Sequence, residues 1–68
     1  MKKYEEICCY DDFEGSLAEF RVYRTRTSIK IFRTENYSPW ERVSIETLQW
    51  YINHASRVIM DKPITKNI

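Results

Sequence analysis

Residues 17–33, LAEFRVYRTRTSIKIFR, determine the fold that we expect, because apolar and polar residues alternate along two short runs within them. Such alternation is typical of β-strands that have one buried face. A tight turn between the two runs would place Val22 opposite Ile31. The same register sets Tyr23 against Lys30, and each face of the pair then keeps a consistent character. The stretch therefore predicts an antiparallel hairpin.

The segments on either side extend this hairpin into a small sheet. Residues 4–10 are rich in strand-forming types. The acidic stretch 11–16 contains the single glycine of the chain, Gly15, which is free to adopt a positive φ in a turn. Residues 36–39 form a second loop, and residues 40–43 are expected to add a short fourth strand.

The C-terminal part predicts one amphipathic helix. Ser44 is a suitable N-cap, and Glu46 in the first turn favours the helix dipole. Apolar residues then recur at spacings of three and four, which defines one helical stripe. The stripe consists of Ile45, Leu48, Ile52, Ala55 and Ile59. We expect the helix to end near Met60, because Pro63 disfavours its continuation, and residues 61–68 to form a frayed tail.

These elements predict a single small α+β domain over residues 1–60. It consists of a three- to four-stranded antiparallel β-meander with one C-terminal α-helix packed on one face. The sheet residues expected to meet the helix are Leu17, Phe20, Val22, Ile29, Ile31 and Val43. The other face is left to water or to a partner. A domain of this size has an expected stability of only about 3–5 kcal/mol, and a homodimer would increase it.

Residues that carry chemistry are sparse in this chain. Cys8 and Cys9 are adjacent, so a strand directs them to opposite faces and a disulfide between them would be strained. We find no signal peptide and no apolar run of membrane-spanning length, and therefore expect a reduced, cytoplasmic protein. His54 and two adjacent cysteines do not supply a zinc site, and no phosphate-binding loop is present. We expect a binding module without metal or cofactor, not an enzyme.

The outer side of the predicted hairpin is the first candidate binding surface. Residues 20–33 contain five cations and no acid. The candidate nucleic-acid-binding residues are Arg21, Tyr23, Arg24, Lys30, Phe32 and Arg33. In proteins that bind single-stranded nucleic acid, cations follow the phosphates and rings stack on the bases. The alternative is an ordinary exposed sheet face, in which these residue types are simply good strand formers.

The second candidate surface lies on the predicted helix, opposite its apolar stripe. It consists of Thr47, Trp50, His54 and Arg57. Exposed tryptophan and arginine are typical of interface hot spots. This surface would suit a protein-binding inhibitor or adaptor of the phage or mobile-element type that acts on a host protein. The alternative is a rotated helix that buries Trp50, or an indole folded over the helix end.

The pattern of the central and C-terminal segments resembles the positive-cofactor-four type of single-stranded DNA-binding domain. The resemblance rests on FRVYR at 20–24, IKIFR at 29–33, RVSI at 42–45 and Gln49-Trp50 in a terminal helix. It covers about residues 20–58. It implies a curved antiparallel sheet joined to one C-terminal helix, a dimer, and strand binding on basic and aromatic sheet residues.

Overall fold

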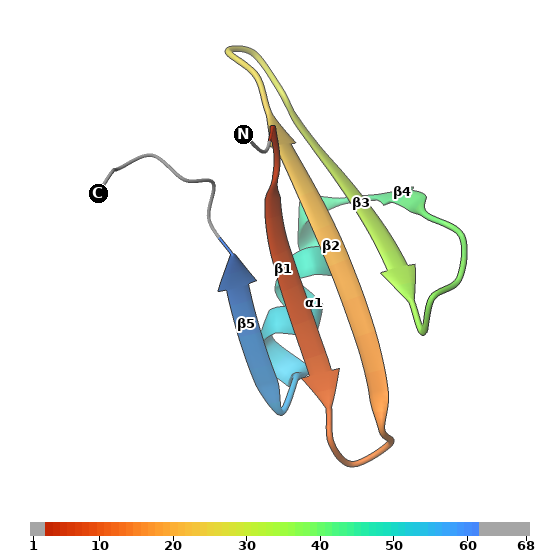
Figure 1. Cartoon of the computed structure of the whole chain (residues 1–68). Helices are drawn as coiled ribbons and strands as arrows, with labels where there is room; N and C mark the ends of the chain where they lie inside the picture. Colours follow the sequence, from red (N-terminus) through yellow and green to blue (C-terminus); the bar gives the residue numbers. More distant parts are fainter. Residues whose placement is uncertain (1–2, 62–68) are drawn as a thin grey trace.

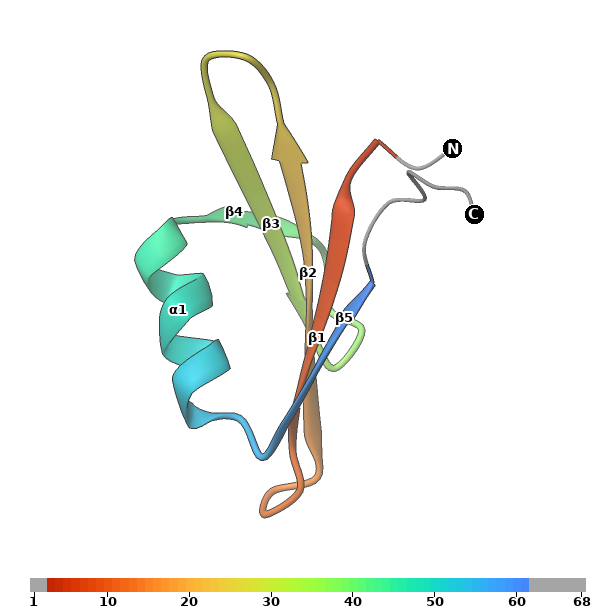
Figure 2. The same cartoon turned by 90° about the vertical axis from the view of Figure 1, so that its left-hand side faces the viewer.

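The computed structural model describes residues 3–61, which form a five-stranded antiparallel sheet and one helix (Figure 1). The elements are β1 (Glu5–Asp11), β2 (Ser16–Arg24), β3 (Ile29–Glu35), β4 (Glu41–Val43), α1 (Ile45–His54) and β5 (Arg57–Asp61). The strands lie in the order β4-β3-β2-β1-β5. Figure 2 shows α1 on one face of the sheet, here called the inner face, whereas no helix within the described residues covers the opposite, outer face. The predicted α+β class and antiparallel sheet are confirmed.

The β2–β3 hairpin has the register that its alternation predicts. Val22 pairs with Ile31, and Tyr23 pairs with Lys30. The turn contains no glycine, and side chains hold it instead. The backbone N–H of Thr25 donates to the carbonyl of Ser28 at 2.9 Å, and the Thr25 hydroxyl accepts from the N–H of Ser28 at 3.0 Å. These bonds satisfy backbone groups within the turn itself.

The core lies between the inner face and α1. Its buried residues are Ile7, Cys9, Ala18, Phe20, Val22, Ile31 and Leu48. Phe20 is 1% exposed, and its ring meets the edge of Tyr51 at 5.2 Å between centroids. Two of the sheet residues expected in the core are misassigned. Leu17 has the opposite strand parity to Phe20, so Ala18 is buried in its place. Ile29 is 44% exposed, because the hairpin extends past the helix (Figure 2).

The helix begins as expected and ends earlier than expected. The Ser44 side chain accepts a hydrogen bond from the N–H of Thr47, which confirms the predicted N-cap. The last helical residue is His54, not Met60. Ala55 is extended, with φ −74 and ψ 148, and its N–H donates back to the carbonyl of Tyr51. The N–H of Ser56 then donates to the carbonyl of Tyr10 at 2.7 Å, which returns the chain to the sheet.

The returning segment is β5, a strand that the sequence pattern did not predict. It pairs antiparallel with β1, and Ile59 lies opposite Cys8. The sheet therefore has five strands instead of three or four, and the helix does not end the domain. Val58 and Ile59 are β-branched, and such residues favour strands over helices. Asp61, which we expected in a frayed tail over 61–68, is instead the last residue of β5, and the rest of that tail, 62–68, lies outside the described residues.

None of the helical structure within residues 3–61 is long and apolar enough to cross a membrane.

Candidate nucleic-acid interface

Alternation along the hairpin brings four of the six predicted nucleic-acid-binding residues to the outer face. In β2, Arg21 and Tyr23 point away from the side that buries Phe20 and Val22. In β3 the corresponding positions are Lys30 and Phe32. Arg21 pairs with Phe32 and Tyr23 pairs with Lys30 across the two strands, so each cation lies beside a ring.

Arg21 is held between two aromatic rings that come from distant segments. Its guanidinium carbon lies 4.9 Å from the centroid of Tyr4 and 4.4 Å from the centroid of Trp40. Each contact is a cation–π interaction. Tyr4 precedes β1, and Trp40 follows the loop in which Asn36 and Tyr37 have positive φ values of 52 and 65. The two rings fix the position of the guanidinium on the outer face.

Further ring contacts connect the neighbouring strands. The centroids of Tyr4 and Tyr23 lie 5.1 Å apart, and those of Tyr23 and Phe32 lie 5.8 Å apart with the ring planes at 89°. The guanidinium of Arg42, in β4, lies 5.9 Å from the Phe32 ring. A shallow depression of ≈ 560 Å³ opens beside these side chains. Its lining consists of Arg21, Tyr23, Thr25, Lys30, Phe32 and Trp40.

The positive charge of the outer face is concentrated on the β3 and β4 side. Glu6 lies opposite Arg21 in the β1–β2 register, and Glu19 lies opposite Thr34, so two acids share this face on β1 and β2. Lys30 and Arg42 lie on β3 and β4, where no acid occupies an outer position. An anionic ligand would therefore be drawn toward the side of the sheet that also carries Phe32.

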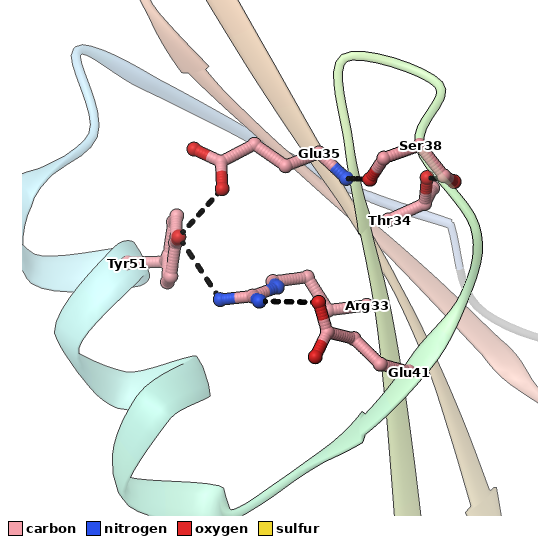
Figure 3. Close-up of polar contacts among 6 residues, drawn as sticks. All are labelled: Arg33, Thr34, Glu35, Ser38, Glu41 and Tyr51. Atoms are coloured by element: carbon pink, nitrogen blue, oxygen red, sulfur yellow. Dashed lines mark hydrogen bonds and ion pairs between the residues drawn. The ribbon is translucent and has the colours of Figure 1, made fainter.

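Arg33, a predicted nucleic-acid contact, instead belongs to the inner face. It pairs with Phe20 in the β2–β3 register and therefore shares the face of the core. Its Nη1 donates to the Tyr51 hydroxyl at 3.2 Å, and its Nη2 forms an ion pair with Glu41 at 3.0 Å (Figure 3). The Tyr51 hydroxyl donates in turn to Glu35 at 3.2 Å. Burial, with the charge of Glu35, raises the pKa of Tyr51, so its hydroxyl remains a donor.

The same view shows how the loop after β3 is attached. The Thr34 hydroxyl donates to the carbonyl of Ser38, and the N–H of Glu35 donates to the Ser38 side chain at 3.1 Å (Figure 3). The loop is thereby tied back to the end of β3. This attachment limits where the following residue, Trp40, can lie relative to the outer face.

Two other predicted arginines are bound elsewhere. Arg24, at the end of β2, has the parity of the inner face and forms an ion pair with Glu5 at 3.1 Å. Arg57 lies in β5 and not on the helix. Its guanidinium lies 4.5 Å from the Tyr10 ring and 3.1 Å from Asp12. The hydrogen bond from Arg57 to Asp12 raises the pKa of Arg57.

Three contributors to the outer face were missed in the sequence: Tyr4, Trp40 and Arg42. Tyr4 shares strand parity with Cys8 and Tyr10, and this alternation is visible in the sequence. The register between β1 and β2, which brings Tyr4 next to Arg21, is not visible in the sequence. The position of Trp40 depends on the conformation of the preceding loop. The place of Arg42 on the outer face depends on the β3–β4 pairing, which sets Arg42 opposite Phe32.

The helix keeps three of the four residues predicted for the second surface. Trp50 is 54% exposed and stacks on the ring of His54, with 4.3 Å between centroids and 18° between planes. Its edge meets Tyr51 at 5.2 Å. Thr47 is half-buried, and its hydroxyl lies 3.2 Å from that of Ser44. The exposed part of this surface is therefore the Trp50–His54 pair.

Neither Cys8 nor Cys9 forms a disulfide within the described residues, and Cys9 is buried. Within residues 3–61 no group of three histidine, cysteine or acidic side chains is arranged to hold a metal ion. Comparison of the chain with protein-family models, curated proteins and solved structures finds no match. The geometry of the outer face is thus the physical basis for the function proposed below.

Proposed function

We propose that this protein binds single-stranded nucleic acid across the outer face of its sheet. Tyr23 and Phe32 would stack on bases, whereas Arg21, Lys30 and Arg42 would contact phosphates. The observation that supports this function best is the accumulation of rings and cations on the one sheet face that α1 leaves uncovered (Figure 2). Such a combination is characteristic of proteins that bind single strands with little sequence preference.

The ring geometry favours a single strand over a duplex. The planes of Tyr23 and Phe32 are at 89° to each other, so two bases stacked on them would lie in different planes. A flexible single strand can turn its bases in this way, whereas the bases of a duplex are parallel and already stacked inside the helix. Each stacked base would contribute about 1–3 kcal/mol to binding.

The position of Arg21 beside two aromatic rings supports binding of an anionic ligand. The rings of Tyr4 and Trp40 lie close to the guanidinium of Arg21, so its remaining interactions are those of its N–H donors. A cation held in place before the ligand arrives loses less conformational entropy when it binds a phosphate.

The test is fluorescence anisotropy with a labelled, unstructured oligonucleotide at several salt concentrations. Tyr23→Ala and Phe32→Ala should each weaken binding by about 1–3 kcal/mol through lost stacking. Lys30→Ala and Arg21→Ala should lower affinity for all sequences and reduce the salt slope by about one unit. Trp50→Ala is the matched control, because it removes an exposed ring on the helix and should leave strand binding unchanged.

Two results would contradict this function. One is wild-type protein that does not bind the oligonucleotide at micromolar concentration and low salt. The other is binding that Trp50→Ala abolishes and Phe32→Ala leaves intact, which would move the contact from the sheet to the helix.

The second candidate function is protein binding through the helix. It is favoured by the Trp50–His54 stack, which leaves about half of a large indole exposed. Such a contact fits an inhibitor or adaptor that acts on a host protein, and its affinity should change little with salt. A pull-down with and without nuclease separates the candidates. A partner that survives nuclease treatment and is lost with Trp50→Ala would support the helix surface.

A further inference from the structure

β5 is an edge strand with an apolar centre. It pairs with β1 along one side only, so within residues 3–61 its other side has no strand partner. Ile59 is 51% exposed and Met60 is 53% exposed. β4, at the opposite edge, has only three residues and begins with Glu41 and Arg42, which is how proteins protect an edge from further pairing. β5 is longer and has no charge at its three central positions.

The sequence of β5, RVIMD, is complementary to itself in the antiparallel direction. When two copies pair about Ile59, Val58 of one copy lies opposite Met60 of the other, and Ile59 meets its counterpart. Apolar pairs placed directly across two strands stabilise a sheet. A shift of two residues in either direction separates Val58 from Met60 and shortens the pairing.

We propose that β5 is the interface between two copies of this chain, which pair β5 to β5 about a two-fold axis through Ile59. The interface is isologous, because the same five residues serve both copies. The axis is perpendicular to the sheet, as in any antiparallel strand pair. Both helices then lie on one side of a continuous sheet, and both outer faces lie together on the other side.

The proposed β5–β5 pairing also buries apolar surface on the inner face. Met60 lines a groove of ≈ 350 Å³ between α1 and the β1–β5 side of the sheet, together with Ile45, Leu48 and Ile52. In the paired strands, Val58 of the second copy lies next to Met60 at the rim of this groove. Pairing thus covers exposed apolar surface as well as satisfying the free edge of β5.

The first test is the mass of the protein in solution, measured by light scattering or sedimentation without nucleic acid. The wild type should have twice the chain mass of 8.3 kDa at about 100 μM protein. Ile59→Lys sets two cations against each other on the axis and should give the mass of one chain. Ile29→Lys is the matched control, since Ile29 is an isoleucine of similar exposure on the hairpin and away from β5. Circular dichroism should show both variants folded.

The second test is specific to the two-fold register. Ile59→Lys and Ile59→Glu should each be monomeric, whereas an equimolar mixture should form a dimer, because only a strand paired about Ile59 sets residue 59 against its counterpart. A wild type with the mass of one chain would overturn the proposal, as would a dimeric Ile59→Lys variant. A mixture that stays monomeric would overturn the register. None of these results bears on whether the outer face binds nucleic acid.

Discussion

The inner and outer faces of the sheet are built from the same strands and have opposite characters. The inner face is apolar and covered by α1, and its central residue, Phe20, is almost completely buried. The outer face carries rings and cations beside a shallow depression. Successive residues of a strand point to opposite faces, so neighbouring positions in one short chain belong to two different surfaces. Stability and the proposed nucleic-acid binding should therefore respond to different mutations.

Each face also contains the residue type that characterises the other. The inner face includes Arg33, whose charge is balanced by Glu41 and hydrogen-bonded to Tyr51. The outer face includes large rings, which contact one another and the guanidinium of Arg21. A cation is tolerated beside a core where it has partners, and rings are tolerated in solvent where they cover one another's surface.

The largest expected effect on stability distinguishes two phenylalanines that lie on opposite faces of the sheet. Phe20→Ala removes a ring that is 1% exposed and should cost about 3–5 kcal/mol. This loss equals the whole stability expected for a domain of this size, about 3–5 kcal/mol, so the variant should be unfolded by circular dichroism. Phe32→Ala should melt close to the wild type. Equal melting temperatures for the two variants would show that the faces are not divided as described.

The next comparison tests the helix side of the core. Leu48→Ala truncates the buried residue of α1 and should cost about 2–5 kcal/mol. Gln49→Ala, at the neighbouring exposed position, should change the free energy of unfolding by less than about 0.5 kcal/mol. Both values follow from urea denaturation. A Leu48→Ala variant as stable as Gln49→Ala would mean that α1 packs on the sheet through another stripe.

A smaller effect concerns two tyrosine hydroxyls. Tyr51→Phe leaves Arg33 without one of its acceptors and Glu35 without a donor, and should cost about 1 kcal/mol. Tyr23→Phe removes a hydroxyl from the outer face and should have no measurable effect on stability. Thermal melts of the two variants give the comparison. If Tyr23→Phe proves the more destabilising, the network in Figure 3 contributes less than its geometry indicates.

The smallest effect distinguishes the two adjacent thiols. Cys9 is 3% exposed, and burial, with the neighbouring Cys8, raises its pKa from 9.0 to about 11. Cys8 has the parity of the outer face. An alkylating reagent used below pH 9 should therefore modify Cys8 well before Cys9 in folded protein, because the thiolate is the reactive form. Peptide mapping by mass spectrometry measures both rates. Equal rates in the folded protein would contradict the assignment of Cys9 to the core.

The same shift gives stability a pH dependence at alkaline pH. The folded state keeps the Cys9 proton up to about pH 11, whereas the unfolded chain releases it near 9.0. Unfolding therefore releases a proton between these values. The contribution of Cys9 is complete below pH 9 and is lost as the pH rises toward 11. Cys9→Ala should reduce this part of the pH dependence in denaturation curves.

The sequence by itself determined the hairpin, its register and the start of the helix. Alternation fixed which residues share a face, so Val22 lies opposite Ile31 and Arg21 and Tyr23 share the outer face with Lys30 and Phe32. The N-cap at Ser44 was equally local, since a side chain only needs to reach a backbone N–H three residues away. The same rule of alternation would have excluded Leu17 and Arg33 from the faces to which they were assigned.

Only the tertiary structure decided where the helix ends, which strand follows it and which rings complete the outer face. Ile59 continues the apolar spacing of α1, and neither glycine nor proline separates it from the helix. Its pairing with Cys8 across β1 and β5 joins residues far apart in the chain. The contacts of Arg21 with Tyr4 and Trp40 likewise depend on three segments at once. Local sequence patterns carry no information about such long-range contacts, because these contacts are set by how the strands pair in space.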